Sequence, residues 1–269
     1  MYKIGWFSSG RGAGSRALLT TAMDNIKSGN IKAEVSFVFC NREPGQTEET
    51  DKFHELVKSY GIPLVYYSSQ QYEPELRKRD IEQWRDAYDL KVIEALKGYD
   101  ADLCVLAGYM LVTGAEMCRQ FNQLNLHPAV PGGPKGTWKE VIWQLIDEQA
   151  TETGAMMHLA TPELDEGPPV TYCKFSIRGP LFDKYWDEIN GKLIADIQAS
   201  DGEENNLFVT IRKYGLVREY PLIVSSIKAF SEGRVKIENN NIVDSSGNVI
   251  EAYDLSKEID EGLKKEGLI

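Results

Sequence analysis

The sequence contains few cysteines and histidines, and neither set has the spacing of a metal site. Its four cysteines, Cys40, Cys104, Cys118 and Cys173, include no Cys-x-x-Cys pair, which argues against a zinc ribbon or a redox-active dithiol. Three of them lie in apolar, strand-like runs, where a small buried thiol is the common case. The three histidines are too scattered to chelate a metal from one helix. We therefore expect no bound metal.

Long apolar runs and an excess of positive charge are also missing. No stretch is apolar for long enough to span a bilayer, and the N-terminus enters a strand-like segment without the regions of a signal peptide. Lysine and arginine number 30 against 41 aspartates and glutamates, a formal net charge of −11. This balance disfavours nucleic acid and anionic membranes as partners. We expect a cytoplasmic protein, a monomer or homodimer, that binds small molecules.

Short apolar runs alternate with helix-like stretches through the first half of the 269 residues. This alternation predicts an α/β, Rossmann-like fold with a mostly parallel twisted sheet and helices on both faces. Ligands bind beyond the carboxyl ends of the strands in such sheets. Gly10, Asn41, Gly108 and His127 fall at those ends, which predicts one shared cleft. The expected strands are 4–8, 33–40, 64–67, 103–107 and one from 124, and the expected helices lie at 15–27, 47–60 and within 73–97.

The pattern changes in the second half of the chain. A helix is predicted at 136–149, followed by strands at 154–160 and 169–175 that form a hairpin. The polar stretch 179–206 is predicted to be a surface insertion or loop. A final helix is expected from about Tyr220 to Glu232, with Pro221 in its first turn. Segments 234–237 and 248–250 then predict a small C-terminal hairpin.

A glycine-rich loop, Ser9-Gly10-Arg11-Gly12-Ala13-Gly14-Ser15, separates the first predicted strand from the first predicted helix. Glycines let the backbone approach a phosphate, and a helix N-terminus supplies N–H donors. Arg11 and Arg16 add positive charge. The spacing matches neither the dinucleotide fingerprint nor the P-loop, and a plain tight turn is the alternative. No suitably placed acidic residue closes the second strand, so NAD is a poor fit. We predict a phosphate site.

Asn125 and His127 alternate on a predicted strand, so their side chains point the same way at its end, before Pro128. An amide and an imidazole can stabilise an oxyanion, and a carboxylate such as Asp165 can orient or reprotonate the imidazole. These are the groups that acyl transfer to an amine requires. From the residues alone, a structural histidine and an ordinary polar turn around Asp165 stay open as alternatives.

Taken together, these segments resemble the folate-dependent formyltransferases over most of the chain. The similarity is greatest to the branch that formylates glycinamide ribonucleotide in purine biosynthesis. The matching segments are Leu106–Met110, Asn125–Pro128, Lys135–Gly136, Gly154–Ala155 through His158, Thr161 with Glu163–Pro168, Tyr220–Ile223 and Gly233–Lys236.

The resemblance implies a catalytic triad of Asn125, His127 and Asp165, with 10-formyltetrahydrofolate as the donor co-substrate. It implies one domain, 1–269, with a phosphate-binding half (1–124), a catalytic and folate-binding half (125–235) and a C-terminal hairpin and tail (236–269). The phosphate of the acceptor would contact Gly10 to Arg16 together with Lys135 and Gly136. The folate would contact Gly108, Met110, Leu111, Val112, His158, Ala160, Thr161 and Leu164.

The departures from the family concern the acceptor. The family loop typically contains Gly-x-Gly-Ser-Asn, whereas the serine and asparagine are missing from Gly10–Gly14. A glutamate that contacts ribose in the family aligns near Leu216, with Glu219 close by. An arginine often found after the Gly-Tyr/Phe-Met segment is Leu111 here. Another amine acceptor, such as an amino-sugar nucleotide, and hydrolysis of the donor are therefore alternatives. A non-enzymatic folate or nucleotide binder is a third.

Overall fold

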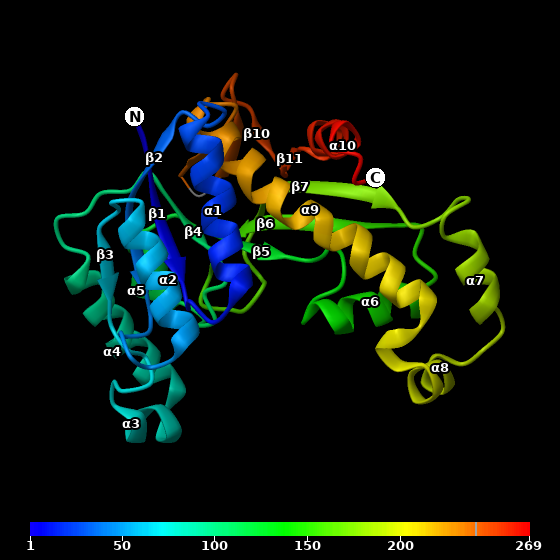
Figure 1. The fold of residues 1–269 in the computed structure, drawn as a ribbon, viewed down its shortest axis with the longest axis horizontal. Coiled ribbons are helices and arrows are strands. Elements are labelled where there is room, and N and C mark those ends of the chain that lie inside the picture. The colour runs from blue at the N-terminus through cyan, green and yellow to red at the C-terminus, as the bar shows by residue number, and fades with distance from the viewer. Residues whose placement is uncertain (240) are drawn as a thin grey trace. The chain divides into compact units, whose positions relative to one another are not determined.

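The structure is a computed structural model that describes residues 1–239 and 241–269. Eight strands are hydrogen-bonded in the order β11-β7-β6-β5-β4-β1-β2-β3, and a small sheet has the order β10-β9-β8 (Figure 1). The α/β fold with a mostly parallel sheet is thus confirmed. The chain forms two compact units, called unit 1 (1–125, 158–168 and 227–248) and unit 2 (126–157, 169–226 and 249–269).

Unit 1 holds the parallel strands. Strands buried on both faces are nearly continuous in their apolar character, and β4 is buried along its whole length, whereas β3 at the edge of the sheet has no buried residue. β1 pairs in parallel with β2 and with β4, β2 pairs with β3, and β4 pairs with β5. Parallel pairing brings the carboxyl ends of these strands to one edge. The strands are β1 (Tyr2–Ser8), β2 (Ala33–Cys40), β3 (Leu64–Tyr66), β4 (Leu103–Leu106) and β5 (Gln123–His127).

Two helices of unit 1 begin at polar residues whose side chains satisfy a backbone N–H group of the first turn. Thr47 accepts a hydrogen bond from Thr50 N at the start of α2, and Asp80 accepts one from Gln83 N at the start of α4. The stretch expected to hold one or two helices contains α3 and α4, while α5 was not predicted. The helices are α1 (Ala13–Lys27), α2 (Glu48–Ser59), α3 (Pro74–Arg79), α4 (Ile81–Ala95) and α5 (Ala115–Gln120).

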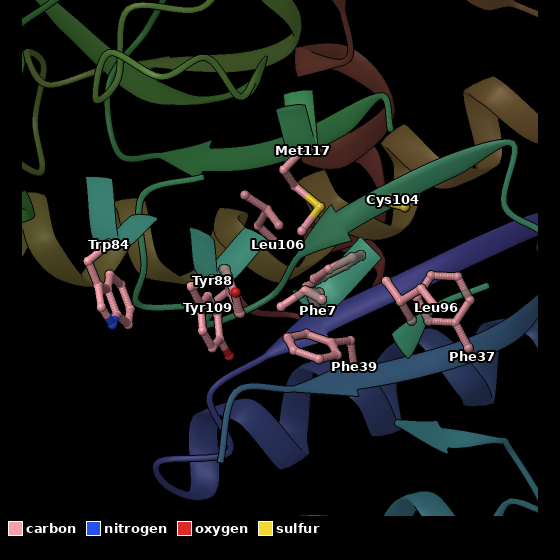
Figure 2. Packing of buried hydrophobic residues seen from close by; sticks show 11 residues of the cluster. Phe7, Phe37, Phe39, Trp84, Tyr88, Leu96, Cys104, Leu106, Tyr109 and Met117 are labelled. Carbon is pink, nitrogen blue, oxygen red and sulfur yellow. The ribbon is translucent and has the colours of Figure 1, made fainter. Parts of the chain in front are cut away.

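An aromatic cluster joins the sheet of unit 1 to α4 (Figure 2). The ring of Phe7 lies 5.4 Å from that of Phe39 and 5.7 Å from that of Tyr109, measured between centroids. On α4, Trp84 and Tyr88 stack at 5.0 Å. Such contacts contribute about 0.5–1.5 kcal/mol each beyond the area they bury. The cluster therefore fixes Tyr109, the central residue of the Gly108–Met110 segment beyond β4.

Asp89 of α4 fastens the other end of the same loop. Its buried carboxylate accepts a hydrogen bond from the backbone N–H of Gly114, four residues after Met110. Burial raises the pKa of Asp89 to about 7, although the Gly114 hydrogen bond opposes the rise. The loop from Gly108 to Gly114 is thus anchored by a ring at its start and by a buried carboxyl group at its end.

Unit 2 contains most of an antiparallel hairpin, β6 (Glu152–Leu159) and β7 (Pro169–Ser176). Ile177 N donates to Thr151 O at its open end, and a Cβ on Gly154 would lie 1.9 Å from Cys173 O. The predicted hairpin is therefore confirmed. Helix α6 (Trp138–Asp147) begins with a reciprocal capping box between Thr137 and Glu140. β11 (Tyr253–Asp254) pairs in parallel with β7.

The prediction of a loop or surface insertion at 179–206 was wrong. The stretch forms α7 (Asp183–Ile189), α8 (Ile194–Ser200) and a short 3₁₀ helix, η1 (Gly202–Glu204). The prediction relied on the polar composition of this stretch. Four of its apolar residues are nevertheless buried in the core of unit 2 with residues of α6 and α9, namely Phe182, Trp186, Ile189 and Ile197. The three-to-four-residue spacing of the first three is the spacing of one helix face.

The last long helix, α9 (Asn206–Ser231), begins well before the predicted start near Tyr220. Asn205 Oδ1 accepts hydrogen bonds from the backbone N–H groups of Leu207 and Phe208, which satisfies two first-turn donors. Pro221 consequently lies inside the helix and not in its first turn, where it removes one backbone donor. The preference of proline for a first turn was overridden by the packing of Leu207 and Phe208, which are both buried.

The C-terminal segments also differ from the prediction. β8 (Val235–Glu238) pairs antiparallel with β9 (Asn241–Asp244), a strand that was not predicted, and β10 (Val249–Ile250) is the third strand of this sheet. The expected tail contains α10 (Ser256–Lys265), whose Ile259 and Leu263 are buried. In the described residues, no helix has the length and apolar character needed to cross a membrane.

We expect Trp186→Ala to lower the free energy of unfolding by about 3–5 kcal/mol, because it empties a large site in the core. The indole also donates to Ile177 O at 2.6 Å and stacks on the Arg178 guanidinium at 3.7 Å. Urea unfolding followed by circular dichroism measures the change. Leu193→Ala is the control, because Leu193 lies in the same stretch but is 70% exposed. Equal effects of the two variants would contradict the helical core at 179–206.

We expect the free energy of unfolding to depend less on pH in Asp89→Asn than in the parent. An unfolded aspartate titrates near 4 and folded Asp89 near 7, so the unfolded chain loses the proton first. The contribution of Asp89 to stability therefore falls as the pH rises from about 4 to about 7. Urea unfolding at both ends of this range gives the slope. The same slope in both proteins would contradict the burial of this carboxyl group.

Candidate active site

Three polar side chains meet in unit 1 where β5 and β6 end. Asn125 Nδ2 lies 3.3 Å from His158 Nε2 and 3.5 Å from Asp165 Oδ1. His158 Nε2 and Asp165 Oδ1 are 3.4 Å apart. The structure thus brings the predicted catalytic residues Asn125 and Asp165 together. It also brings in His158, which the resemblance had assigned to the folate contacts.

The hydrogen-bond partners of His158 indicate its tautomer. Nδ1 lies 2.9 Å from the backbone oxygen of Leu159, which can only accept, so Nδ1 carries a hydrogen. In a neutral ring Nε2 then has a lone pair, which accepts a hydrogen from the Asn125 amide. Asn125 is half-buried while His158 is buried. The histidine therefore orients the amide and leaves part of Asn125 accessible.

The loop that carries Asp165 has a backbone conformation that few residue types can adopt. Asp165 has a φ of 56°, in the left-handed region, which aspartate tolerates better than most residues. A Cβ on Gly167 would lie 1.6 Å from the oxygen of Leu159, so only glycine fits there. Local strain of this kind costs about 1–3 kcal/mol. The surrounding contacts hold the Asp165 carboxylate beside Asn125 despite that cost.

His127 differs from its predicted place at the rim of the sheet. It follows Asn125 by two residues on β5, as expected, but its side chain is only 2% exposed. Its Nε2 lies 2.8 Å from the backbone oxygen of Pro134, and both residues belong to unit 2. A carbonyl can only accept, so Nε2 carries a hydrogen.

The glycine-rich loop is shorter than predicted, because α1 begins at Ala13. Gly12 precedes the helix and supplies no side-chain cap. The backbone N–H groups of Ala13, Gly14 and Ser15 therefore form an uncapped first turn, which favours an anion. The backbone of Gly10 is held in place because the hydroxyl of Thr50 donates a hydrogen bond to its carbonyl oxygen at 3.3 Å.

The two arginines near this loop differ in how readily they could bind an anion. The guanidinium of Arg16 pairs with Glu49 at 2.6 Å and lowers the pKa of that carboxyl group, whereas Arg11 is exposed. An anion would compete with Glu49 for Arg16. His54, one helical turn along α2 from Thr50, is buried, and burial lowers the pKa of its imidazole. A neutral His54 adds no charge to the loop.

Ser9 connects this loop to the segment after β4, a contact that the sequence analysis missed. Its N–H donates to Gly108 O at 3.0 Å, and its hydroxyl accepts from Met110 N at 2.9 Å. Gly108 has a φ of 68°, and a Cβ there would lie 3.1 Å from Ser15 Oγ. The only signal in the sequence was the position of Ser9 directly before the first glycine.

The predicted folate residues that lie in unit 1 include two exposed apolar side chains. Met110 and Leu164 are each 61% exposed and lie on two separate loops. Leu111 and Val112 are partly buried. The backbone at the end of β6 is ordered by two further bonds, from Ala160 N to Gln123 O at 2.8 Å and from Thr161 Oγ1 to Glu163 O at 2.8 Å.

Lys135 and Gly136, the remaining predicted phosphate ligands, belong to unit 2. The side chain of Lys135 is exposed. Gly136 has a φ of 104° and directly precedes the capping box of α6. Their role in phosphate binding stays a prediction. Among residues 1–239 and 241–269, the structure contains no group of three or more side chains that could hold a metal ion.

Comparison with known proteins identifies the family. The model of the family described as formyl transferase matches residues 3–179. Phosphoribosylglycinamide formyltransferase of Escherichia coli is 26% identical over 236 residues, which cover 86% of this chain and 88% of that protein. The enzyme of the same name from Haemophilus influenzae is 26% identical over 244 residues, covering 89% and 92%.

A solved structure shows the same fold. The phosphoribosylglycinamide formyltransferase of Coxiella burnetii superposes with a TM-score of 0.65 at 18% identity, covering 94% of this chain and 98% of that one. At this identity the likeness concerns the fold alone. The match to the family model extends over more than half of the chain and includes β1, the glycine-rich loop, Asn125, His127 and Asp165. The chain belongs to the formyl transferase family.

Proposed function

We propose that this enzyme transfers a formyl group from 10-formyltetrahydrofolate to the amine of glycinamide ribonucleotide. The observation that carries the proposal is the convergence of the Asn125 amide with His158 and Asp165 at the ends of β5 and β6. A half-buried amide donor beside a carboxylate suits a reaction in which an oxyanion forms and protons move. Two relatives that bear the name of this activity match nearly the full chain.

In the proposed reaction the amine nitrogen bonds to the formyl carbon, and the bond from that carbon to N10 of the folate breaks. The Asn125 amide keeps one hydrogen on His158 and turns the other, which in this structure points to Asp165 at 3.5 Å, to the formyl oxygen as negative charge develops on it. One proton leaves the amine and one reaches N10, so the count balances. Asp165, which lies beside Asn125, accepts the first proton and returns it to N10 through water.

His127 would act together with Asn125 in this scheme, as the resemblance implies, and help to stabilise the negative charge that develops on the formyl oxygen. Its buried ring is held by the hydrogen bond from Nε2 to Pro134 O.

The donor would contact the exposed apolar side chains of Met110 and Leu164. The flat pterin ring buries apolar surface against such groups while its polar edge bonds to backbone atoms. In this proposal those atoms belong to Met110 through Val112 and to Ala160 through Asp165. The anchoring of the first loop by Tyr109 and Asp89 preorganises these backbone groups.

The acceptor phosphate would bind at the uncapped first turn of α1, with Arg11. A contribution of Lys135 and Gly136 stays a prediction from the resemblance. The ion pair between Arg16 and Glu49 reduces what Arg16 can contribute, and the loop lacks the serine and asparagine that are typical of the family. These two observations favour another amine, such as an amino-sugar nucleotide, as the second candidate acceptor.

We expect Asn125→Ala and His127→Ala each to lower kcat by about 100-fold or more, because each removes a donor to the oxyanion. Release of tetrahydrofolate, measured with and without glycinamide ribonucleotide, gives the rates. Asn122→Ala is the matched control, since Asn122 is exposed and directly precedes β5 at its opposite end. We expect its kcat to stay within about twofold of the parent.

Parent-like turnover in Asn125→Ala would contradict the assigned chemistry. Release of tetrahydrofolate that ignores glycinamide ribonucleotide but responds to an amino-sugar nucleotide would favour the second acceptor. Release without any amine would indicate hydrolysis of the donor. Circular dichroism of each variant separates a loss of chemistry from a loss of fold.

A further inference from the structure

Ser9 belongs to the glycine-rich loop and is hydrogen-bonded to both ends of the Gly108–Met110 segment. Its N–H donates to Gly108 O at 3.0 Å, and its hydroxyl accepts from Met110 N at 2.9 Å. The side chain is buried, with 1% of its surface exposed. Loss of the hydroxyl would remove the partner that the Met110 N–H has in this structure.

A second contact joins the same two segments. Ser15, in the first turn of α1, packs against Gly108, where a Cβ would lie 3.1 Å from its hydroxyl oxygen. Glycine at position 108 therefore serves two purposes: it adopts a left-handed φ, and its lack of a Cβ leaves room for the first turn of α1. Any shift of the glycine-rich loop must also shift Gly108 and Met110, because the polar and the packing contacts act together.

The proposed function assigns the two segments to different substrates. The glycine-rich loop would bind the acceptor phosphate, and Met110 would contact the folate. An anion that orders Gly10 through Ser15 thus also orders Ser9, and with it the N–H of Met110. Thermodynamic linkage requires the reverse effect to be equal, so the folate must improve anion binding by the same factor.

We propose that Ser9 is a positioning residue that couples binding of the acceptor phosphate to binding of the folate. The inference rests on the proposed function, since it needs both substrates to bind where that function places them. The loss of one hydrogen bond changes an equilibrium by about two- to tenfold, and this is the coupling in affinity expected from Ser9.

The experiment measures the Kd of tetrahydrofolate by titration calorimetry with and without saturating inorganic phosphate, with chloride to match the ionic strength. In the parent, phosphate should lower this Kd by about two- to tenfold. In Ser9→Ala the two values should become equal, while tetrahydrofolate still binds. Ser9→Thr keeps a hydroxyl and should keep the coupling.

Ser8→Ala is the matched control. Ser8, the last residue of β1, is also buried, but its hydroxyl accepts a bond from Gly10 N at 3.3 Å, at the start of the glycine-rich loop. We expect Ser8→Ala to retain the ratio of the two Kd values, whatever it does to phosphate affinity alone. A merely structural role of buried hydroxyl groups in this loop would lower the ratio in both variants.

The reciprocal titration keeps the proposal testable if Ser9→Ala does not fold. In the parent, tetrahydrofolate must lower the Kd of phosphate by the same factor. A ratio of one in the folded parent, or an unchanged ratio in folded Ser9→Ala, would overturn the coupling while leaving formyl transfer intact. If the parent does not bind tetrahydrofolate at all, the proposed function fails as well.

Discussion

The backbone hydrogen bond from Ala160 N to Gln123 O, 2.8 Å long, is the constraint on which the candidate site depends. It joins the end of β6 to the start of β5. Two residues forward on β5 is Asn125, and two residues back on β6 is His158, and their side chains meet at 3.3 Å. The two segments therefore run antiparallel here, and their register alone decides which side chains face each other. A slip of one residue would direct them to opposite faces.

The remaining features of unit 1 hold loops in place around that pair. The left-handed Asp165 and the close approach of Gly167 to Leu159 bring a carboxylate back to the strand ends. Tyr109 and Asp89 anchor the loop from Gly108 to Gly114, which carries Met110. Exposed apolar groups are thus displayed on a rigid framework, which lowers the conformational entropy lost when a ligand binds.

Much of the fold could be predicted because local pattern and burial agree in the first half of the chain. β2 was predicted with its observed bounds, since a strand buried on both faces is nearly continuous in its apolar character. The segment 179–206 failed because its charges outnumber a few well-spaced apolar residues, such as Trp186 and Ile189. The start of α9 was predicted too late because proline prefers the first turn of a helix, and Pro221 was placed there. Tertiary packing around Phe208 instead extends the helix toward its N-terminus, to Asn206.

The candidate site was predictable only in part for a related reason. Asn125 and Asp165 were found from chemistry and resemblance, and the structure brings them within 3.5 Å. The burial of His127 and its bond to Pro134 O depend on the shape of the turn between these two residues, which the sequence pattern did not predict. Ser9 and Met110 are 101 residues apart in the chain. Contacts of that separation leave no periodic trace in one sequence, so the link between the two loops emerged only from the structure.

The central claim is that the formyl group passes to an amine at Asn125, His127 and Asp165. The most direct test supplies 10-formyltetrahydrofolate labelled with carbon-13 in the formyl group, together with glycinamide ribonucleotide, and follows the label by NMR. The account predicts that the label appears as a new formamide on the acceptor at the rate at which tetrahydrofolate forms. Label that appears only as formate, or that stays on the folate, would contradict it.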